Sequence, residues 1–229
     1  MGKLSLLTLI LFSVLILLIL PSILANLQVE KTSQDEVMIT DLNAPAVFNL
    51  KMYNDGAANE FKFYNLFGFE MSPKETILIN SEQTKEVELK IYPRDLSNYQ
   101  GYYTLQYFIK GGPSDQEEKL TFEIISLKDA FEIGSSDVSP ESNSIKIFIK
   151  NKKNFNFEKI NAEFSSPFFK LEKTFSLSPY EKKEFEITLK KEDFNQLIAG
   201  YYTLKGKINV ENVNTEINGV INFIEKDIS

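Results

Sequence analysis

Apolar and polar residues alternate with a period of two over most of the chain after residue 26. In one run Val87, Leu89 and Ile91 alternate with charged residues, and the run 145–149 has isoleucine at every second position. A period of two sends successive side chains to opposite faces of a strand, so each strand has one apolar and one wet face. The pattern predicts antiparallel sheets that pack face to face as sandwiches.

The same organisation occurs twice. The pentapeptide Gly-Tyr-Tyr-Thr-Leu stands at 101–105 and again at 200–204, a spacing of 99 (200 minus 101). Asn54 and Asn151, which each end an alternating run, are 97 apart (151 minus 54). Drifts of one or two residues are typical of loop insertions between strands. The chain is therefore expected to hold two copies of one structural unit.

Each copy has about seven short strands in roughly 100 residues, a layout typical of an immunoglobulin-like sandwich. We predict an all-β chain with two tandem immunoglobulin-like antiparallel β-sandwiches, preceded by an N-terminal hydrophobic signal or anchor helix. The predicted segments are 1–25 for the signal or anchor, 26–127 for the first sandwich and 128–229 for the second. The short boundary near Leu127 predicts two sandwiches in near-direct contact, end to end.

The N-terminus predicts export. Lys3 precedes a long apolar run at 4–20 that contains no charged residue, and Pro21 and Ala25 follow it. This three-part form indicates a secretory signal that is cleaved after Ala25. The run is also long enough to span a bilayer, so an uncleaved signal-anchor is the alternative. In both cases the positive-inside rule places the body outside the cytoplasm: secreted, periplasmic, or at the cell surface with an N-terminal membrane anchor.

The repeated pentapeptide is predicted to have a structural role at the same place in each copy. Tyr103 and Tyr202 are in phase with the apolar residues of their strands, as expected for a tyrosine corner, in which the ring is buried and the hydroxyl returns to the backbone. Gly101 and Gly200 are expected to allow a tight backbone entry to those strands.

Four aromatic residues are candidates for contact with a partner. Tyr102 and Tyr201 have the opposite phase to the buried tyrosines, so they are predicted to point to solvent. Phe168 and Phe169 fall on a weak strand and are predicted either to pack inside the protein or to form a docking patch.

Composition excludes several chemistries. The chain has no Cys and no His, which removes thiol nucleophiles, histidine bases, disulfides and zinc sites of the Cys/His type. A net charge of -7 argues against a nucleic-acid partner, since such proteins usually carry a basic stripe. The carboxylates alternate on the wet faces of strands, so no catalytic residue, metal site or cofactor is predicted.

Two stretches, 177–204 and more loosely 79–105, combine a Leu-x-Pro-x-Glu-like turn, a Glu-hydrophobic strand and Gly-x-Tyr-x-hydrophobic. In this they resemble the immunoglobulin-like modules of prokaryotic cell-surface proteins and glycosidases. That resemblance implies spacer or adhesive domains without catalytic residues. We therefore expect a non-enzymatic envelope protein that binds a protein or an envelope polymer. The alternative is an extracytoplasmic chaperone or assembly factor that uses an exposed sheet edge.

Overall fold

The computed structural model describes residues 27–94, 99–190, 192 and 198–224, and these residues form an all-β structure, as the alternation predicts. The predicted signal or anchor helix at 1–25 lies outside the described residues. Within the described part of the chain, no helix is long and apolar enough to cross a membrane.

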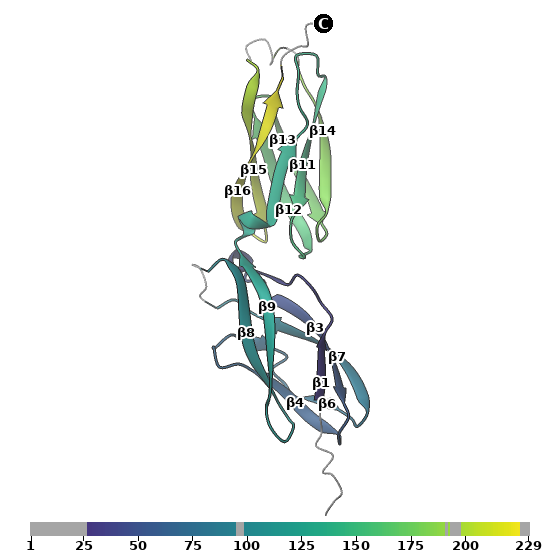
Figure 1. Cartoon of the computed structure of the whole chain (residues 1–229). Coiled ribbons are helices and arrows are strands. Elements are labelled where there is room, and N and C mark those ends of the chain that lie inside the picture. Colours follow the sequence, from purple (N-terminus) through teal and green to yellow (C-terminus); the bar gives the residue numbers. More distant parts are fainter. Residues whose placement is uncertain (1–26, 95–98, 191, 193–197, 225–229) are drawn as a thin grey trace, which may run out of the picture.

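The strands form two groups that share no sheet, here called unit 1 and unit 2 (Figure 1). Unit 1 has two sheets, with strand orders β1-β3-β7-β5 and β2-β9-β8-β4-β6, and unit 2 has β10-β11-β14 and β13-β12-β15-β16. The elements of unit 1 are β1 (Leu27–Lys31), β2 (Val37–Ile39), η1 (Thr40–Leu42), β3 (Ala46–Asn54), β4 (Asn59–Tyr64), β5 (Met71–Ser72), β6 (Ile77–Ile79), β7 (Gln83–Ile91), β8 (Gly101–Lys110) and β9 (Gln116–Ile125). A short turn, η2 (Leu127–Ala130), then leads to β10 (Phe131–Ser135), β11 (Ser144–Asn151), β12 (Phe157–Ser166), β13 (Phe169–Leu177), β14 (Lys182–Thr188), β15 (Gly200–Val210) and β16 (Val213–Phe223).

Burial follows the alternation that the sequence shows. In β3 the side chains of Phe48, Leu50 and Met52 are buried, and those between them are exposed. Phe48 packs edge to face on Phe122 of β9, so the two sheets of unit 1 meet in one core. Complete burial of such a side chain contributes about 1.5–3 kcal/mol, and this repeated contribution holds the sheets together without disulfides.

The β2 strand departs from the predicted antiparallel pattern. It runs parallel to β9, with Val37 opposite Glu123 and Ile39 opposite Ile125. The chain leaves β1 and joins the other sheet at an edge, alongside the last strand of the unit. All three β2 residues are buried, which explains why this segment shows no alternation and was not predicted as a strand.

A buried asparagine ends the third strand of unit 1 and its counterpart in unit 2. Asn54 donates through Nδ2 to the carbonyl of Ala57 at 2.8 Å and to that of Ile79 at 3.0 Å. Asn151 donates in the same way to the carbonyls of Phe155 at 2.7 Å and Ser178 at 2.9 Å. Each amide ties together two loops at the end of its unit and satisfies carbonyls that are shielded from water.

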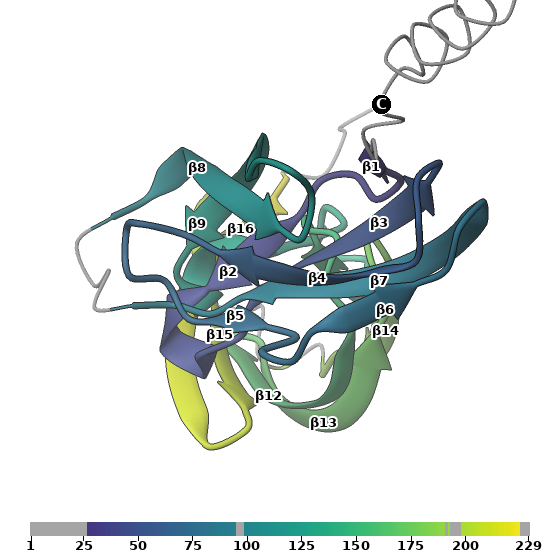
Figure 2. The ribbon, with the colours of Figure 1, turned by 90° about the horizontal axis from the view of Figure 1, so that it is seen from below.

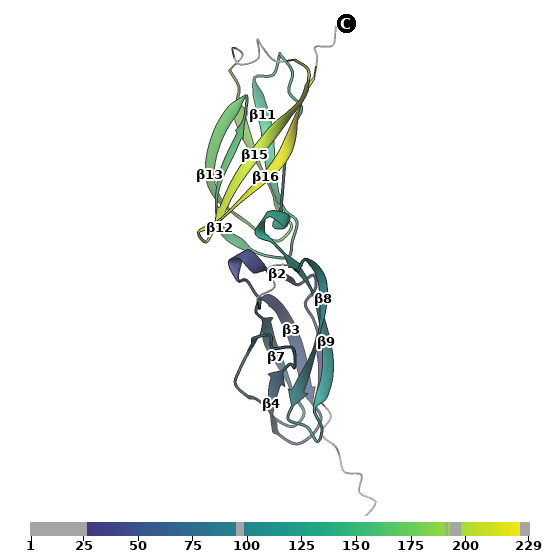
Figure 3. The same cartoon turned by 90° about the vertical axis from the view of Figure 1, so that its left-hand side faces the viewer.

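The two units are stacked end to end in an elongated molecule (Figures 1 and 3). The turns η1 and η2 lie between them, whereas Leu27, paired with Asn54, lies at the far end of unit 1. In the view along the long axis, unit 1 lies in front of unit 2 (Figure 2). The described chain therefore begins at one end of the long axis, and β16 ends at the other.

Replacing Asn151 with Ala is expected to lower the free energy of unfolding by about 1–3 kcal/mol, because two shielded carbonyls lose their donor. Urea unfolding measures the change. Asn156→Ala, an exposed residue of the same loop, is the matched control and is expected to change stability by less than about 0.5 kcal/mol. Equal effects of the two substitutions would contradict the role of Asn151.

Candidate functional site: the junction between the units

Unit 1 contributes apolar side chains to the core of unit 2. Val37 and Ile39 of β2 and Ile125 of β9 are buried in the same cluster as the core residues of unit 2, which include Phe131 and Phe157. Met38, between them, belongs instead to the core of unit 1. The short strand β2 thus faces one core on each side, and the apolar contact is continuous across the junction.

A loop of unit 2 adds polar contacts to this apolar contact. Lys153 Nζ forms an ion pair with Glu123 Oε2 at 2.6 Å, and both side chains are about four-fifths buried, with 20% and 23% exposed. Asn154 Nδ2 donates to the carbonyl of Gln34 at 2.7 Å. Asn151 accepts from the Lys153 amide at 3.0 Å and so positions the loop that carries both contacts.

A second pair of contacts lies beside the loop. The Tyr180 hydroxyl donates to Asp35 Oδ2 at 3.0 Å, and the Leu127 amide donates to Asp41 Oδ2 at 2.7 Å. Burial, followed by the hydrogen bond with Asp35, raises the pKa of Tyr180, and the negative charge of Glu123 adds to the shift. Two carboxylates of unit 1 therefore accept hydrogen bonds where the units meet. One donor is in η2, where the chain enters unit 2, and the other is in the turn before β14.

Tyr102 lies next to these groups and remains open to solvent. Its side chain is 82% exposed and stands opposite Glu123 in the β8–β9 register. The Tyr180 amide donates to the carbonyl of Lys153 at 3.3 Å, and Lys153 is the ion-pair partner of Glu123, so Tyr180 and Tyr102 both lie next to this ion pair. We call Asp35, Tyr102, Glu123, Lys153 and Tyr180 the junction cluster.

Tyr201 occupies the equivalent position in unit 2 and is 81% exposed. It stands opposite Asn222 in the β15–β16 register, where unit 1 has Glu123 opposite Tyr102. Both predicted contact tyrosines therefore point to solvent, but Tyr102 alone of the two belongs to the junction cluster.

The other tyrosines of the pentapeptides face inward. Tyr202 donates its hydroxyl to the carbonyl of Ile198 at 2.7 Å, a return to the backbone just upstream. Tyr103 packs its ring against Phe69 and Phe122. These contacts fix the start of β8 and β15 against the core.

The two glycines before them have backbone conformations that suit glycine. Gly101 has a φ of 105° and Gly200 a φ of 155°, and no heavy atom lies within 4 Å of a Cβ built on either. The constraint at these positions is therefore conformational and does not come from lack of space.

Phe168 is not available to a partner. Of the two interpretations of this residue, packing inside the protein is confirmed and a docking patch is wrong. It is only 5% exposed and packs against Tyr202 and Phe223. Phe169 is half-buried and packs against the same core. Phe168 lies in the turn between β12 and β13, and Phe169 begins β13 opposite Ser166, so this turn places both rings on the core of unit 2.

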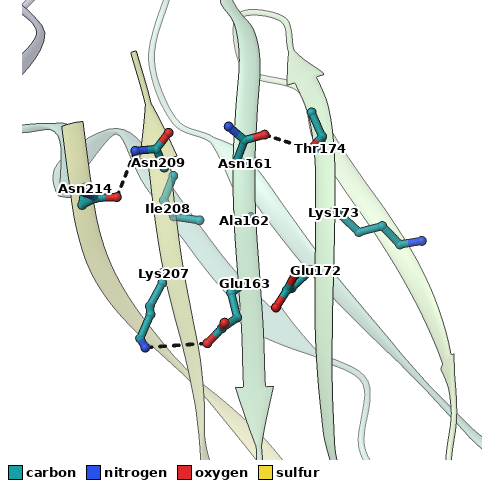
Figure 4. A pocket seen from close by; sticks show the side chains of 10 residues that line it. All are labelled: Asn161, Ala162, Glu163, Glu172, Lys173, Thr174, Lys207, Ile208, Asn209 and Asn214. Carbon is teal, nitrogen blue, oxygen red and sulfur yellow. Dashed lines mark hydrogen bonds and ion pairs between the residues drawn. The ribbon is translucent and has the colours of Figure 1, made fainter. Parts of the chain in front are cut away.

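A shallow hollow of about 470 Å³ lies on the outer face of the four-stranded sheet of unit 2 (Figure 4). A row of polar side chains crosses it: Thr174 donates to Asn161 Oδ1 at 2.8 Å, and Asn209 donates to Asn214 Oδ1 at 2.9 Å. Asn161 and Asn209 stand opposite each other in register. These groups satisfy one another, as on an ordinary wet sheet face.

A carboxylate on the same face is also paired. Glu163 forms ion pairs with Lys170 at 2.8 Å and with Lys207 at 3.7 Å. The hydrogen bond from Lys170 is the main cause that lowers the pKa of Glu163, so this carboxyl group is ionised at neutral pH. Across the described residues, no group of three or more Asp or Glu side chains is arranged to hold a metal ion.

Sequence reasoning did not find Asp35, Lys153 or Tyr180. Each looks like a solvated loop residue in its own copy, because its partner comes from the other unit. The signal for the junction was the unbroken apolar run Val37-Met38-Ile39, since consecutive buried residues in a short strand require apolar cover on both faces.

No family model matches the chain, and no curated protein matches it. Among solved structures, it is similar to the YadV chaperone, with 10% identity over 85% of this chain and 99% of that chain and a TM-score of 0.31. The periplasmic chaperone SfaE gives 11% identity over 87% of this chain and 100% of that chain, also with a TM-score of 0.31. A protein of unknown function from Porphyromonas gingivalis W83 gives 12% identity over 86% and 99%, with a TM-score of 0.32. Scores this low transfer no residue role or activity.

Replacing Lys153 with Met is expected to lower the free energy of unfolding by about 1–2 kcal/mol, because the Glu123 carboxylate loses its cation in a mostly buried place. Adding Glu123→Gln is expected to recover most of the loss. Lys205→Met, which breaks a half-exposed pair with Glu216, is the control and is expected to cost less than about 0.5 kcal/mol. Equal losses in a urea titration of the two single variants would contradict a structural role for the junction pair.

Proposed function

We propose that this chain is a non-enzymatic, extracytoplasmic protein whose two sandwich units act together as a rigid interaction or spacer module. The observation that carries the proposal is the continuous apolar contact at the junction, where Val37, Ile39 and Ile125 of unit 1 are buried with the core of unit 2. Bending at the junction would expose these side chains to water, at a cost of about 25 cal/mol for each Å² of apolar surface.

The arrangement of the ends suits a module that holds a surface away from its attachment point. The strand β1 begins at one end of the long axis, and β16 ends toward the other (Figure 1). The apolar N-terminal run at 4–20 supports an exported location, in which the body extends away from the membrane or from the point of cleavage. A stiff connection would keep the far tip at a fixed distance.

Two spin labels can measure this stiffness, and the absence of cysteine makes their placement simple. Cysteines are introduced at Lys62 in unit 1 and at Lys205 in unit 2, both exposed. Pulsed electron resonance is expected to give one narrow distance distribution. The double variant Val37→Ser and Ile125→Ser is expected to broaden it, because the apolar contact between the units is lost.

The control for this measurement is Val47→Ser, which changes a partly exposed valine of β3 outside the junction. It is expected to leave the distribution unchanged. A broad distribution in the unsubstituted protein would contradict the rigid-module proposal, whatever partner the protein binds.

A free sheet edge favours a second candidate function, an extracytoplasmic chaperone or assembly factor. Leu189 donates to the carbonyl of Asn143, and Asn151 donates to that of Glu181. Because ladder bonds alternate, every second residue of β14 turns its backbone groups away from β11. In the described residues no strand pairs with this outer side, so a client strand could add to it.

Proline at Glu184 tests this candidate, because it removes one outward N–H without breaking the ladder to β11. If the edge binds clients, the protein should slow the aggregation of reduced insulin B chain, and Glu184→Pro should abolish the effect while Glu184→Ala retains it. Unchanged light scattering with the unsubstituted protein would contradict the chaperone function.

A further inference from the structure

The junction cluster brings exposed aromatic rings and carboxylates together. Tyr102 is 82% and Tyr180 is 48% exposed, so both rings offer surface to solvent. Asp35 is exposed and uses Oδ2 to accept the Tyr180 hydroxyl, and Glu123 lies opposite Tyr102. Neighbouring phenol rings and carboxylates form an environment that favours a cation.

The charges of the cluster do not cancel. The positive charge of Lys153 compensates the negative charge of Glu123 through the 2.6 Å ion pair. Asp35, in contrast, accepts a hydrogen bond from the neutral hydroxyl of Tyr180. Partial burial is the main cause that raises the pKa of Tyr180, and the hydrogen bond and negative charge of Asp35 add to it. The whole chain adds to this bias, since its net charge is -7.

The internal duplication supplies a comparison. Tyr201 is equally exposed at the equivalent position of unit 2, but its cross-strand neighbour is Asn222 rather than a glutamate. Its exposure therefore lacks the acidic surroundings that Tyr102 has at the junction. The difference between the two positions is charge and the nearby second tyrosine, not burial.

We infer that the junction cluster binds a lysine or arginine side chain on an extended segment of a partner protein. The cation would lie against the rings of Tyr102 and Tyr180, where the negative faces of the π-systems attract it. The Asp35 carboxylate would supply a charge-assisted hydrogen bond. Because both units contribute side chains, the site is complete when the units are docked, so the inference rests on the rigid module proposed above.

Fluorescence anisotropy tests this with a labelled peptide of alternating Arg and Gly residues, a Glu-Gly peptide as the negative control, and the complete exported protein. The Arg peptide is expected to bind, and more weakly as salt rises. Tyr102→Leu and Asp35→Asn are each expected to weaken binding by about 3- to 10-fold. Tyr201→Leu is the matched control and is expected to change binding by less than about twofold.

Two results would overturn the inference: no preference for the Arg peptide over the Glu peptide, or equal losses from Tyr102→Leu and Tyr201→Leu. The second result would assign binding to the overall charge of the chain. Both tyrosines are exposed, so neither substitution is expected to disturb folding, and circular dichroism verifies this. The spin-label distances remain narrow if the peptide fails to bind, which separates this inference from the rigid-module proposal.

Discussion

The burial of β2 on both faces is the constraint on which the arrangement of the molecule depends. Met38 points into the core of unit 1, while Val37 and Ile39 point into that of unit 2. A three-residue strand at a sheet edge is stable here because both cores cover it. Its position determines where unit 2 sits, and from this follow the ion pair of Lys153 with Glu123 and the exposed place of Tyr102 beside unit 2.

The two units share their internal supports and differ in the loops that those supports hold. Asn54 and Asn151 bond to loop carbonyls in the same way. The loop held by Asn54 begins with Asp, Gly, Ala and Ala, whereas the loop held by Asn151 carries two lysines, Asn154 and Phe155. The apolar and charged loop of unit 2 contacts unit 1, and the smaller loop of unit 1 lies at the end far from unit 2. The two units are therefore not interchangeable along the long axis.

Local pattern was sufficient to predict the all-β structure and the phase of the main strands, because alternation at positions such as Phe48, Leu50 and Met52 directly encodes one buried face. It also predicted the outward Tyr102 and Tyr201. The junction cluster could not be predicted, because Asp35 and Tyr180 are 145 residues apart and meet through the docking of two units. For the same reason the parallel β2 strand was missed: its cover on one face comes from the other copy.

Residual dipolar couplings of the backbone amides in weakly aligned solution test most directly whether the two units form one rigid body. Couplings from unit 1 and from unit 2, each fitted to its own coordinates, are predicted to give the same alignment tensor in magnitude and orientation. Tensors that differ in magnitude between the units would show independent motion about η2 and would contradict the shared junction core.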